Sequence, residues 1–244
     1  MRILIAADIH ANLAAFEAVL RLVEADGSID RLWCPGDIVG YGPDPSACIA
    51  LVREYSHLAV AGNHDFAAVG KIGTGDFNDA AARAAAWTAE QLSYDERHYL
   101  EMLPEVAYEG DFTFVHGSLR APLWEYILSL PAMEAQLRLM ETPYSVIGHS
   151  HVPFLAEEGN DGKAWSSAWQ DGDLVNLPGS RRIINPGAVG QPRDGDPRAA
   201  YALYDSDAHT ITLHRVEYDI AATQQKIVGA GLPASLAERL SYGR

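Results

Sequence analysis

The chain has 244 residues, of which 48% are hydrophobic and 21% are charged, as is usual for a globular protein. Its formal net charge of −15 argues against a duplex nucleic-acid partner, because a phosphate backbone binds to a basic surface. A small phosphorylated substrate is compatible with this charge, since bound metal cations can invert the local field of an acidic protein.

The chain begins with an apolar run followed by a helical pattern. The run at 3–7 predicts a strand that is buried on both faces. It ends at Asp8, too early for a secretory signal or for a membrane-spanning helix of ~20 residues. We therefore expect a cytoplasmic protein that does not enter a membrane. Asn12 can cap the following helix, which we expect to continue to about residue 26.

Two more strands and a second helix come next. Apolar runs predict strands at 32–34 and 58–61, and Asp44-Pro45 marks the start of a helix that runs to about residue 55. The resulting β-α-β-α-β series implies parallel strands with right-handed crossovers, which is typical of an α/β fold.

The rest of the chain continues what we expect to be a single domain of residues 1–244. Residues 66–103 have a helical pattern, and we expect them to form a layer or cap beside the functional site. The polar stretch 156–182 contains turn signals and predicts a surface hairpin or loop insertion. Further strands are expected at 112–115, 144–147, 183–184, 201–204 and 210–216, with a helix at about 132–140 and a helical C-terminus.

Residues of types that bind metal ions follow five of the predicted strands. These motifs are Asp8-Ile9-His10, Gly36-Asp37, Gly62-Asn63-His64-Asp65, His116-Gly117 and Gly148-His149-Ser150-His151. In parallel α/β sheets the carboxyl ends of the strands open into the crevice where ligands bind, so we expect the motifs to meet there. Five of the nine histidines of the chain lie in these motifs, which concentrates metal-binding groups at one edge.

The spacing inside two of the motifs favours a pair of metal ions. Side chains at i and i+2 of an extended segment point to the same side, about 6.6 Å apart. Asp8 and His10 would then converge on one ion, whereas His149 and His151 would reach two neighbouring ions. Two metals about 3.5–4 Å apart are typical of phosphate-ester hydrolysis. Ligands without thiolate favour manganese, iron, zinc, cobalt or nickel over calcium, and the ligand set does not distinguish among these metals. We expect manganese first, with iron, zinc, cobalt or nickel as alternatives.

Each motif taken alone also has a structural explanation. An Asp and a His two residues apart are common by chance, and Gly-Asp after a strand is often only a turn. His116 could equally be a buried, hydrogen-bonded histidine. The two tetrapeptide motifs, 62–65 and 148–151, are more specific. All five motifs in this order, each at a strand end, indicate a shared site.

Together the motifs resemble those of the calcineurin-like metallophosphoesterase superfamily, over the whole span from Asp8 to His151. The resemblance implies an α/β fold, a four-layer αββα sandwich of two mixed sheets with flanking helices. Asn185-Pro186-Gly187 and Gln191-Pro192-Arg193 make the chain similar to small prokaryotic phosphodiesterases and diadenosine-polyphosphatase-like proteins.

The resemblance also implies the ligands of two divalent metal ions. One ion would be held by Asp8, His10, Asp37 and His151, and the other by Asp37, Asn63, His116 and His149, with the Asp37 carboxylate bridging. A water between two such ions becomes a hydroxide near neutral pH and attacks phosphorus in line.

Five further roles are assigned to residues that are not ligands. His64 would protonate the leaving oxygen as a general acid. Asp65 would orient that imidazole or a neighbouring one, with stabilisation of a turn as the alternative. Asn12, Tyr41 and Arg193 are candidates for substrate binding. Their structural alternatives are a helix cap, a packed loop aromatic and a solvated loop arginine, respectively.

Three functions are compatible with these motifs. The favoured one is a phosphodiesterase that acts on a small phosphorylated substrate, with nucleotides as candidates. The alternatives are a phosphomonoesterase and a non-catalytic scaffold. Ala61 stands where the protein phosphatases of the superfamily have an arginine, which disfavours that branch, and the scaffold members lack the catalytic histidine that His64 supplies. The oligomeric state, the native metal and the physiological substrate stay open.

Overall fold

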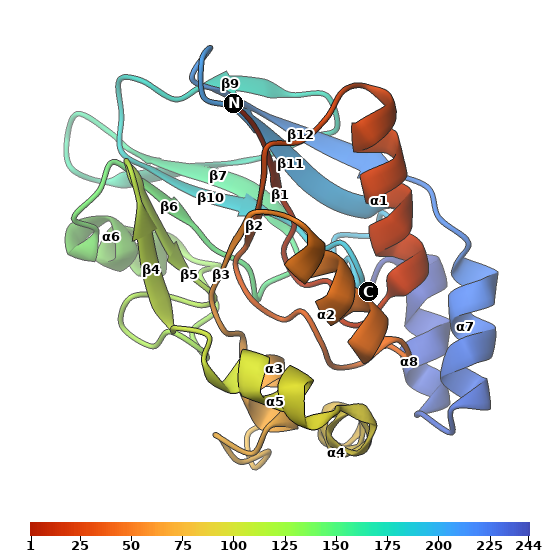
Figure 1. Ribbon diagram of the computed structural model, residues 1–244. Helices are drawn as coiled ribbons and strands as arrows, with labels where there is room; N and C mark the ends of the chain where they lie inside the picture. Colours follow the sequence, from red (N-terminus) through yellow and green to blue (C-terminus); the bar gives the residue numbers. More distant parts are fainter.

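The computed structural model describes residues 1–244 and contains two six-stranded sheets (Figure 1). The strand orders are β3-β2-β1-β11-β12-β9 and β4-β5-β6-β10-β7-β8. Parallel neighbours in the first sheet are β1 (Arg2–Ile5), β2 (Arg31–Cys34) and β3 (His57–Ala59). Parallel neighbours in the second sheet are β5 (Phe112–Val115), β6 (Tyr144–Val146) and β10 (Arg182–Pro186). Each sheet therefore has three parallel strands, and these precede most of the motifs.

Antiparallel strands complete both sheets. The first sheet gains β11 (Ala199–Asp205), β12 (Thr210–Val216) and β9 (Leu174–Asn176). The second sheet gains β4 (Val106–Glu109), β7 (Pro153–Glu158) and β8 (Ala164–Ala168). Both sheets are mixed, which confirms the predicted architecture.

The two sheets pack face to face over an apolar core. Ile3 and Ile5 of β1 belong to the core between the sheets, whereas Leu4 belongs to the core on the outer face of its sheet. Trp33 contacts Phe112 and Phe114 of the other sheet, with both ring centroids 4.9 Å away. Strand β1 is thus buried on both faces, as its continuous apolar run predicted.

Helices cover the outer face of each sheet. Helices α1 (Leu13–Ala25) and α2 (Pro45–Glu54) pack on the first sheet, and α6 (Leu130–Leu139) packs on the second (Figure 1). Asn12 caps α1 by accepting a hydrogen bond from the Ala15 amide at 3.3 Å. The four layers αββα follow from this arrangement.

The remaining helices lie at the end of the sandwich toward which β1, β2 and β3 point. They are α3 (Asn63–Ala68), α4 (Asp79–Gln91), α5 (Tyr94–Glu101), α7 (Ile220–Gly229) and α8 (Ala234–Glu238), with a 3₁₀ turn at Arg239–Tyr242. Buried side chains of α4, α7 and α8 form one cluster that also includes Tyr41. The predicted helical stretch 66–103 thus contains α4 and α5, and α3 begins three residues before it. No helix is both long and apolar enough to cross a membrane.

The segment 156–182, predicted as a surface hairpin or loop insertion, belongs to the two sheets. It contains the end of β7 and all of β8, and these two strands form a hairpin. It also contains β9, which pairs with β12 at the edge of the other sheet. Trp169 and Leu177 are buried in the core between the sheets. Most side chains of β8 and β9 face solvent at a sheet edge, so their sequence lacks the apolar run that marks a buried strand.

Candidate metal centre

Five loops that follow β1, β2, β3, β5 and β6 meet at one end of the sandwich. They bring together every side chain that the sequence predicted as a metal ligand, and each is at most 5% exposed: Asp8, His10, Asp37, Asn63, His116, His149 and His151. The motifs that are far apart in the chain therefore form one buried cluster.

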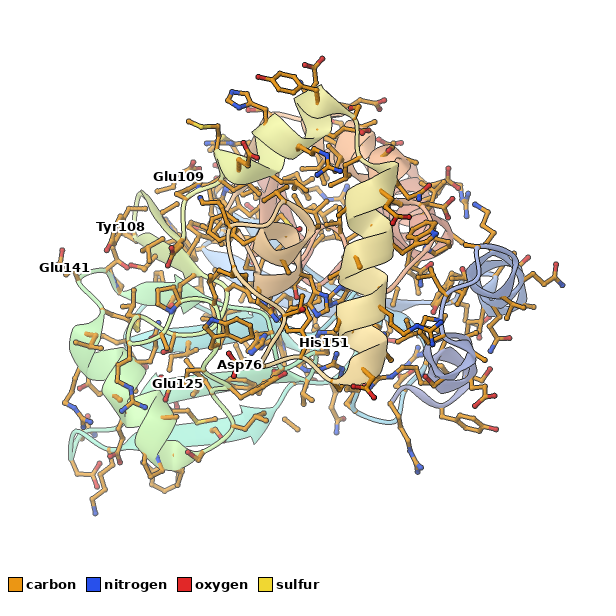
Figure 2. All side chains as sticks on the ribbon, turned by 90° about the horizontal axis from the view of Figure 1, so that it is seen from below. Asp76, Tyr108, Glu109, Glu125, Glu141 and His151 are labelled. Atoms are coloured by element: carbon orange, nitrogen blue, oxygen red, sulfur yellow. The ribbon has the colours of Figure 1, made fainter.

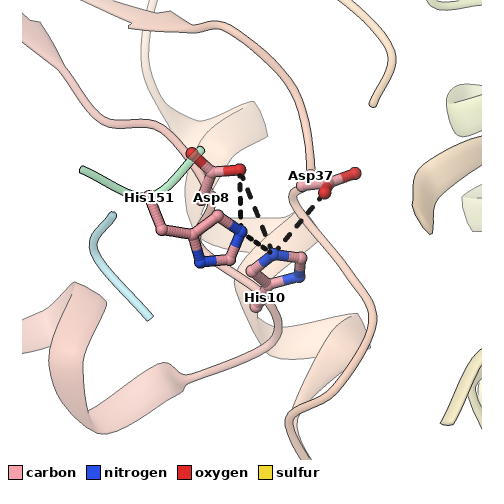
Figure 3. A group of neighbouring side chains, drawn as sticks. All are labelled: Asp8, His10, Asp37 and His151. Atoms are coloured by element: carbon pink, nitrogen blue, oxygen red, sulfur yellow. Dashed lines mark hydrogen bonds and ion pairs between the residues drawn. The ribbon is translucent and has the colours of Figure 1, made fainter. Parts of the chain in front are cut away.

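The first group contains Asp8, His10, Asp37 and His151 (Figure 3). His10 Nε2 lies 3.5 Å from Asp37 Oδ2 and 3.1 Å from His151 Nε2. His151 Nε2 lies 3.4 Å from Asp8 Oδ1. One ligand atom from each of the four residues lies within 4.8 Å of the others, so a single ion could contact all of them.

The second group shares Asp37 with the first. His116 Nε2 lies 3.3 Å from Asp37 Oδ2, 3.1 Å from His149 Nδ1 and 3.2 Å from Asn63 Oδ1. His149 and His151 therefore belong to different groups, in line with the two neighbouring ions that the sequence predicted. Because the Asp37 carboxylate belongs to both, it could bridge two ions.

Backbone carbonyls fix the orientation of all four imidazoles. The contacts are His10 Nδ1 with Val39 O at 3.1 Å, His116 Nδ1 with Pro35 O at 2.9 Å, His149 Nε2 with Trp124 O at 3.2 Å and His151 Nδ1 with Gln191 O at 2.6 Å. A carbonyl oxygen can only accept, so each of these nitrogens donates and the other ring nitrogen of a neutral imidazole presents a lone pair to the cluster. This is the usual support of metal-binding histidines.

The donor atoms of the cluster fit metal cations. Inner nitrogens face each other at 3.1 Å in both groups, and Asp8 Oδ2 is buried without a hydrogen-bond partner. Facing lone pairs and an unpartnered carboxylate oxygen repel one another in a buried site unless a cation lies between them. The residues present are therefore suited to two ions of the transition-metal type.

Burial disfavours the charged forms of most groups in the cluster, and His116 is an exception. Burial raises the pKa of Asp8 to about 7 and lowers that of His149 to about 3. Burial also acts to lower the pKa of His116, but the Asp37 carboxylate outweighs it and raises that pKa to about 9. Without a metal ion, a proton on His116 thus supplies the cation that Asp37 requires.

The backbone of the motifs is left-handed rather than extended. Strand β1 ends at Ile5, and φ is 51° at Asp8, 49° at His10 and 56° at Asp37. His149 and His151 have φ of 65° and 59°. The expected extended i, i+2 geometry is therefore wrong, although the residues converge as predicted. Such backbone costs about 1–2 kcal/mol per residue and persists where surrounding contacts over-determine it.

Asp65 is one source of those contacts. Its Oδ2 accepts hydrogen bonds from the amides of Asp37 and Gly62, each at 2.9 Å, and its Oδ1 accepts one from the Val39 amide at 3.0 Å. Both oxygens bind backbone amides and neither contacts an imidazole, so these contacts match the turn-stabilising alternative. Gly62 is required here because a Cβ would lie 2.0 Å from Asp37 Oδ1.

His64 lies beside the two groups without belonging to either. Its ring centroid is 4.9 Å from that of His10 and 4.2 Å from that of Tyr41, and its backbone amide donates to Asp37 Oδ1 at 2.9 Å. Its Nδ1 is buried without a hydrogen-bond partner. Burial lowers the pKa of His64 to about 4, so the ring is neutral near pH 7 when no anion is bound.

A pocket of about 100 Å³ opens onto both groups and His64. Figure 2 views this end of the molecule and shows Asp76 and His151, which both line the pocket. Aromatic side chains form much of its wall, and Tyr126 stacks on His149 with ring centroids 3.9 Å apart. Asp76 and Phe77, in the loop before α4, were not predicted, because a single aromatic residue in a polar loop matches no motif.

The three predicted substrate-binding residues have different surroundings. Tyr41 and Arg193 line the pocket, and Arg193 Nη2 donates to Gln191 Oε1 at 2.9 Å and to the Tyr41 hydroxyl at 3.4 Å. Asn12 does not line this pocket, and its amide is fully engaged. Its Oδ1 accepts from Ala15 and Thr223, and its Nδ2 donates to Gly190 O. These contacts of Asn12 match the helix cap that was the structural alternative to substrate binding.

Comparison with known proteins identifies a family and several relatives. A family model described as calcineurin-like phosphoesterase superfamily domain matches residues 1–209. The crystal structure of a metallophosphoesterase from Sphaerobacter thermophilus is similar at a TM-score of 0.90 and 46% identity, covering 100% of this chain and 99% of that one. An uncharacterized protein of Methanocaldococcus jannaschii is 37% identical over 248 residues, which are 99% of this chain and 98% of that protein. A symmetrical bis(5'-nucleosyl)-tetraphosphatase of Aromatoleum aromaticum is 31% identical over 73% of this chain and 62% of its own length.

Proposed function

The chain belongs to the calcineurin-like phosphoesterase superfamily, and from that premise we propose that it hydrolyses a phosphodiester bond in a small, nucleotide-like substrate with two divalent metal ions, manganese first. The observation that carries the proposal is the pair of ligand groups that share Asp37. The shared Asp37 carboxylate would hold two ions close together, an arrangement that serves hydrolysis of phosphate esters.

The metal ions, when bound, supply Lewis acidity that neutralises charge on the phosphoryl oxygens and lowers the pKa of water. Asp8, His10 and His151 would hold one ion; Asn63, His116 and His149 would hold the other; and Asp37 would hold both. Asp65 keeps the Asp37 loop in its left-handed conformation through three amide hydrogen bonds.

His64 is the proposed general acid. It lines the pocket beside both groups, where a leaving oxygen would lie. The negative charge of a bound phosphate raises the pKa of a neighbouring imidazole, which favours the protonated ring in the substrate complex. His64 then transfers a proton to the leaving oxygen. Arg193, in the same wall, would bind a phosphoryl oxygen through its guanidinium.

One feature disfavours a protein phosphatase, and a second supports a diester over a monoester. Ala61 occupies the position of the arginine with which protein phosphatases of the superfamily bind a terminal phosphate. The pocket wall contains Tyr41, Trp124 and Tyr126, which can contact a second apolar or nucleobase substituent on phosphorus. The relative from Aromatoleum aromaticum is named for a substrate in which phosphates join two nucleosides.

Two chromogenic substrates test this proposal. With Mn²⁺, the purified protein should hydrolyse bis-p-nitrophenyl phosphate with a higher kcat/KM than p-nitrophenyl phosphate. The reverse preference would favour a phosphomonoesterase, and no hydrolysis of either would contradict the proposed function.

A histidine variant tests the role of His64. His64→Ala should lower kcat by about 10²–10⁴-fold, the usual contribution of general acid catalysis, with both metals retained. Metal loss would instead make His64 a ligand. His98→Ala, which changes an exposed histidine on α5, should leave kcat and metal content unchanged.

A further inference from the structure

The pocket over the two ligand groups is smaller than the proposed substrate needs. Its volume is about 100 Å³, whereas pockets for small-molecule ligands usually have about 300–1,000 Å³. A phosphoryl group with a small substituent fits this volume, whereas a nucleoside substituent exceeds it and would extend past the lining residues or displace some of them. The two walls differ in how firmly they are held.

One wall is the loop that follows β5, and many contacts fix it. The Gly117 amide donates to Pro122 O at 2.6 Å and the Trp124 amide donates to Ala121 O at 3.1 Å. Glu125 forms an ion pair with Arg120. Tyr126 is stacked on His149, and Trp124 O accepts a hydrogen bond from the same imidazole. This wall therefore moves only with the cluster itself.

The opposite wall is the loop of residues 69–78, between α3 and α4. Phe77 lines the pocket, with its ring centroid 4.7 Å from that of His64 and 5.6 Å from that of Trp124. The loop contains Gly70, Gly73 and Gly75, and a Cβ at any of them would meet no atom within 4 Å. Glycines in open space give the backbone freedom without any packing reason for their presence.

The ends of this loop are anchored. The Gly70 and Lys71 amides donate to carbonyls of α3, at 3.1 and 3.0 Å. At the other end the Asn78 side chain caps α4 by accepting from the Ala81 amide at 3.0 Å. Between these two points the Phe77 amide donates to Thr74 O at 3.1 Å, and the partly buried side chains of Ile72 and Phe77 each pack against a hydrophobic cluster. A displacement of the loop would be confined to residues 72–77.

We propose that residues 69–78 form a gate and that Phe77 is a specificity-determining residue, which admits bulky phosphodiesters only when the loop moves away from His64. Small diesters reach the ligand groups without this motion. The gate rests on the proposed function, because it decides which substrates of that reaction reach the metals.

Phe77→Ala tests the gate through the ratio of two kcat/KM values. The substrates are thymidine 5'-p-nitrophenyl phosphate and methyl p-nitrophenyl phosphate, which share a leaving group and differ in bulk. The ratio of bulky to small should rise at least about fivefold in Phe77→Ala. Tyr94→Ala, at an 82% exposed aromatic residue on α5, should leave the ratio at its wild-type value. An unchanged ratio in Phe77→Ala, with hydrolysis intact, would overturn the gate and leave the proposed function standing.

A second variant stiffens the loop and should have the opposite effect on hydrolysis of the bulky substrate. Gly73→Ala with Gly75→Ala restricts the backbone without steric conflict, and should lower kcat/KM for the bulky substrate severalfold while that for the small one stays constant. Gly229→Ala, another glycine with no atom within 4 Å and at the end of α7, is the matched control. Equal effects on both substrates would contradict a gate.

A binding measurement separates the gate from the chemistry. The association rate of AMP, followed by protein fluorescence, should be at least about fivefold faster for Phe77→Ala than for the wild type, whereas that of inorganic phosphate should be unchanged. If the wild type hydrolyses neither diester, the proposed function fails, and the AMP rates alone decide whether the gate exists. Equal AMP rates in both proteins would overturn it.

Discussion

Two sets of loops around one pocket contain glycine for opposite reasons. In the ligand loops a Cβ at Gly62 would lie 2.0 Å from Asp37 Oδ1, whereas in the gate loop a Cβ at Gly73 or Gly75 would meet nothing within 4 Å. The first glycine permits close approach, and the others permit motion. Ligand geometry is thus held by dense contacts, whereas the proposed gate contains glycines that face open space.

Gly62→Ala tests the close approach in the ligand loops, and we expect it to lower kcat more than a change at Gly75 does. The added methyl group displaces the Asp37 carboxylate, and misplacement of a reacting group by about 1 Å can lower turnover about 10²-fold. We expect loss of that order in kcat, with reduced metal content. Gly75→Ala adds the same methyl group in open space and should retain kcat for the small diester. Wild-type turnover in Gly62→Ala would show that the ligand loops adapt.

Asp65→Asn tests the contacts that hold the Asp37 loop. The amide group cannot accept at both positions where the carboxylate accepts, so at least one buried backbone amide loses its partner. We expect a loss of about 1–3 kcal/mol in the free energy of unfolding, measured by urea denaturation. Asp111→Asn, at an exposed position, should change it by less than about 0.5 kcal/mol. Equal free energies of unfolding for the two variants would show that Asp65 does not stabilise the Asp37 loop.

Arg193→Gln should change substrate binding and leave both the ligand loops and the gate in place. Loss of a charged hydrogen bond worth about 1.5–3 kcal/mol corresponds to a rise of roughly 10–100-fold in KM for a diester. Arg193→Lys should recover part of this loss. A fall in metal content instead of a rise in KM would place Arg193 in the support of the cluster.

Sequence patterns predicted most of the fold because the central strands are buried on both faces. β1, β5 and β12 appear as apolar or alternating runs within one or two residues of their observed bounds. β4 and β9 were missed because they are short, and most of their side chains are half-buried or exposed. The turn residues of 156–182 predicted a surface hairpin or a loop insertion, but the membership of β7 and β8 in a sheet depends on pairing with β10, which no local pattern shows.

The residues of the cluster were predicted because their types and their order along the chain identify a family of sites. The geometry of the cluster was not predicted. The left-handed backbone at Asp8, His10 and Asp37 is supported by tertiary hydrogen bonds to residues distant in sequence. Their amides donate to Gly36 O, Asp37 O and Asp65 Oδ2, respectively. The contribution of Phe77 to the pocket arises from the path of the loop before α4. Contacts of this kind follow from packing, which periodicity does not describe.

Metal content per chain tests the central claim most directly, because both ligand groups depend on Asp37. Elemental analysis after equilibration with Mn²⁺ should find two ions in the wild type, one in His151→Ala and one in His116→Ala. Asp37→Ala should retain neither ion and should show no turnover of bis-p-nitrophenyl phosphate. Two ions in Asp37→Ala, or wild-type turnover without bound metal, would contradict a shared, bridging carboxylate.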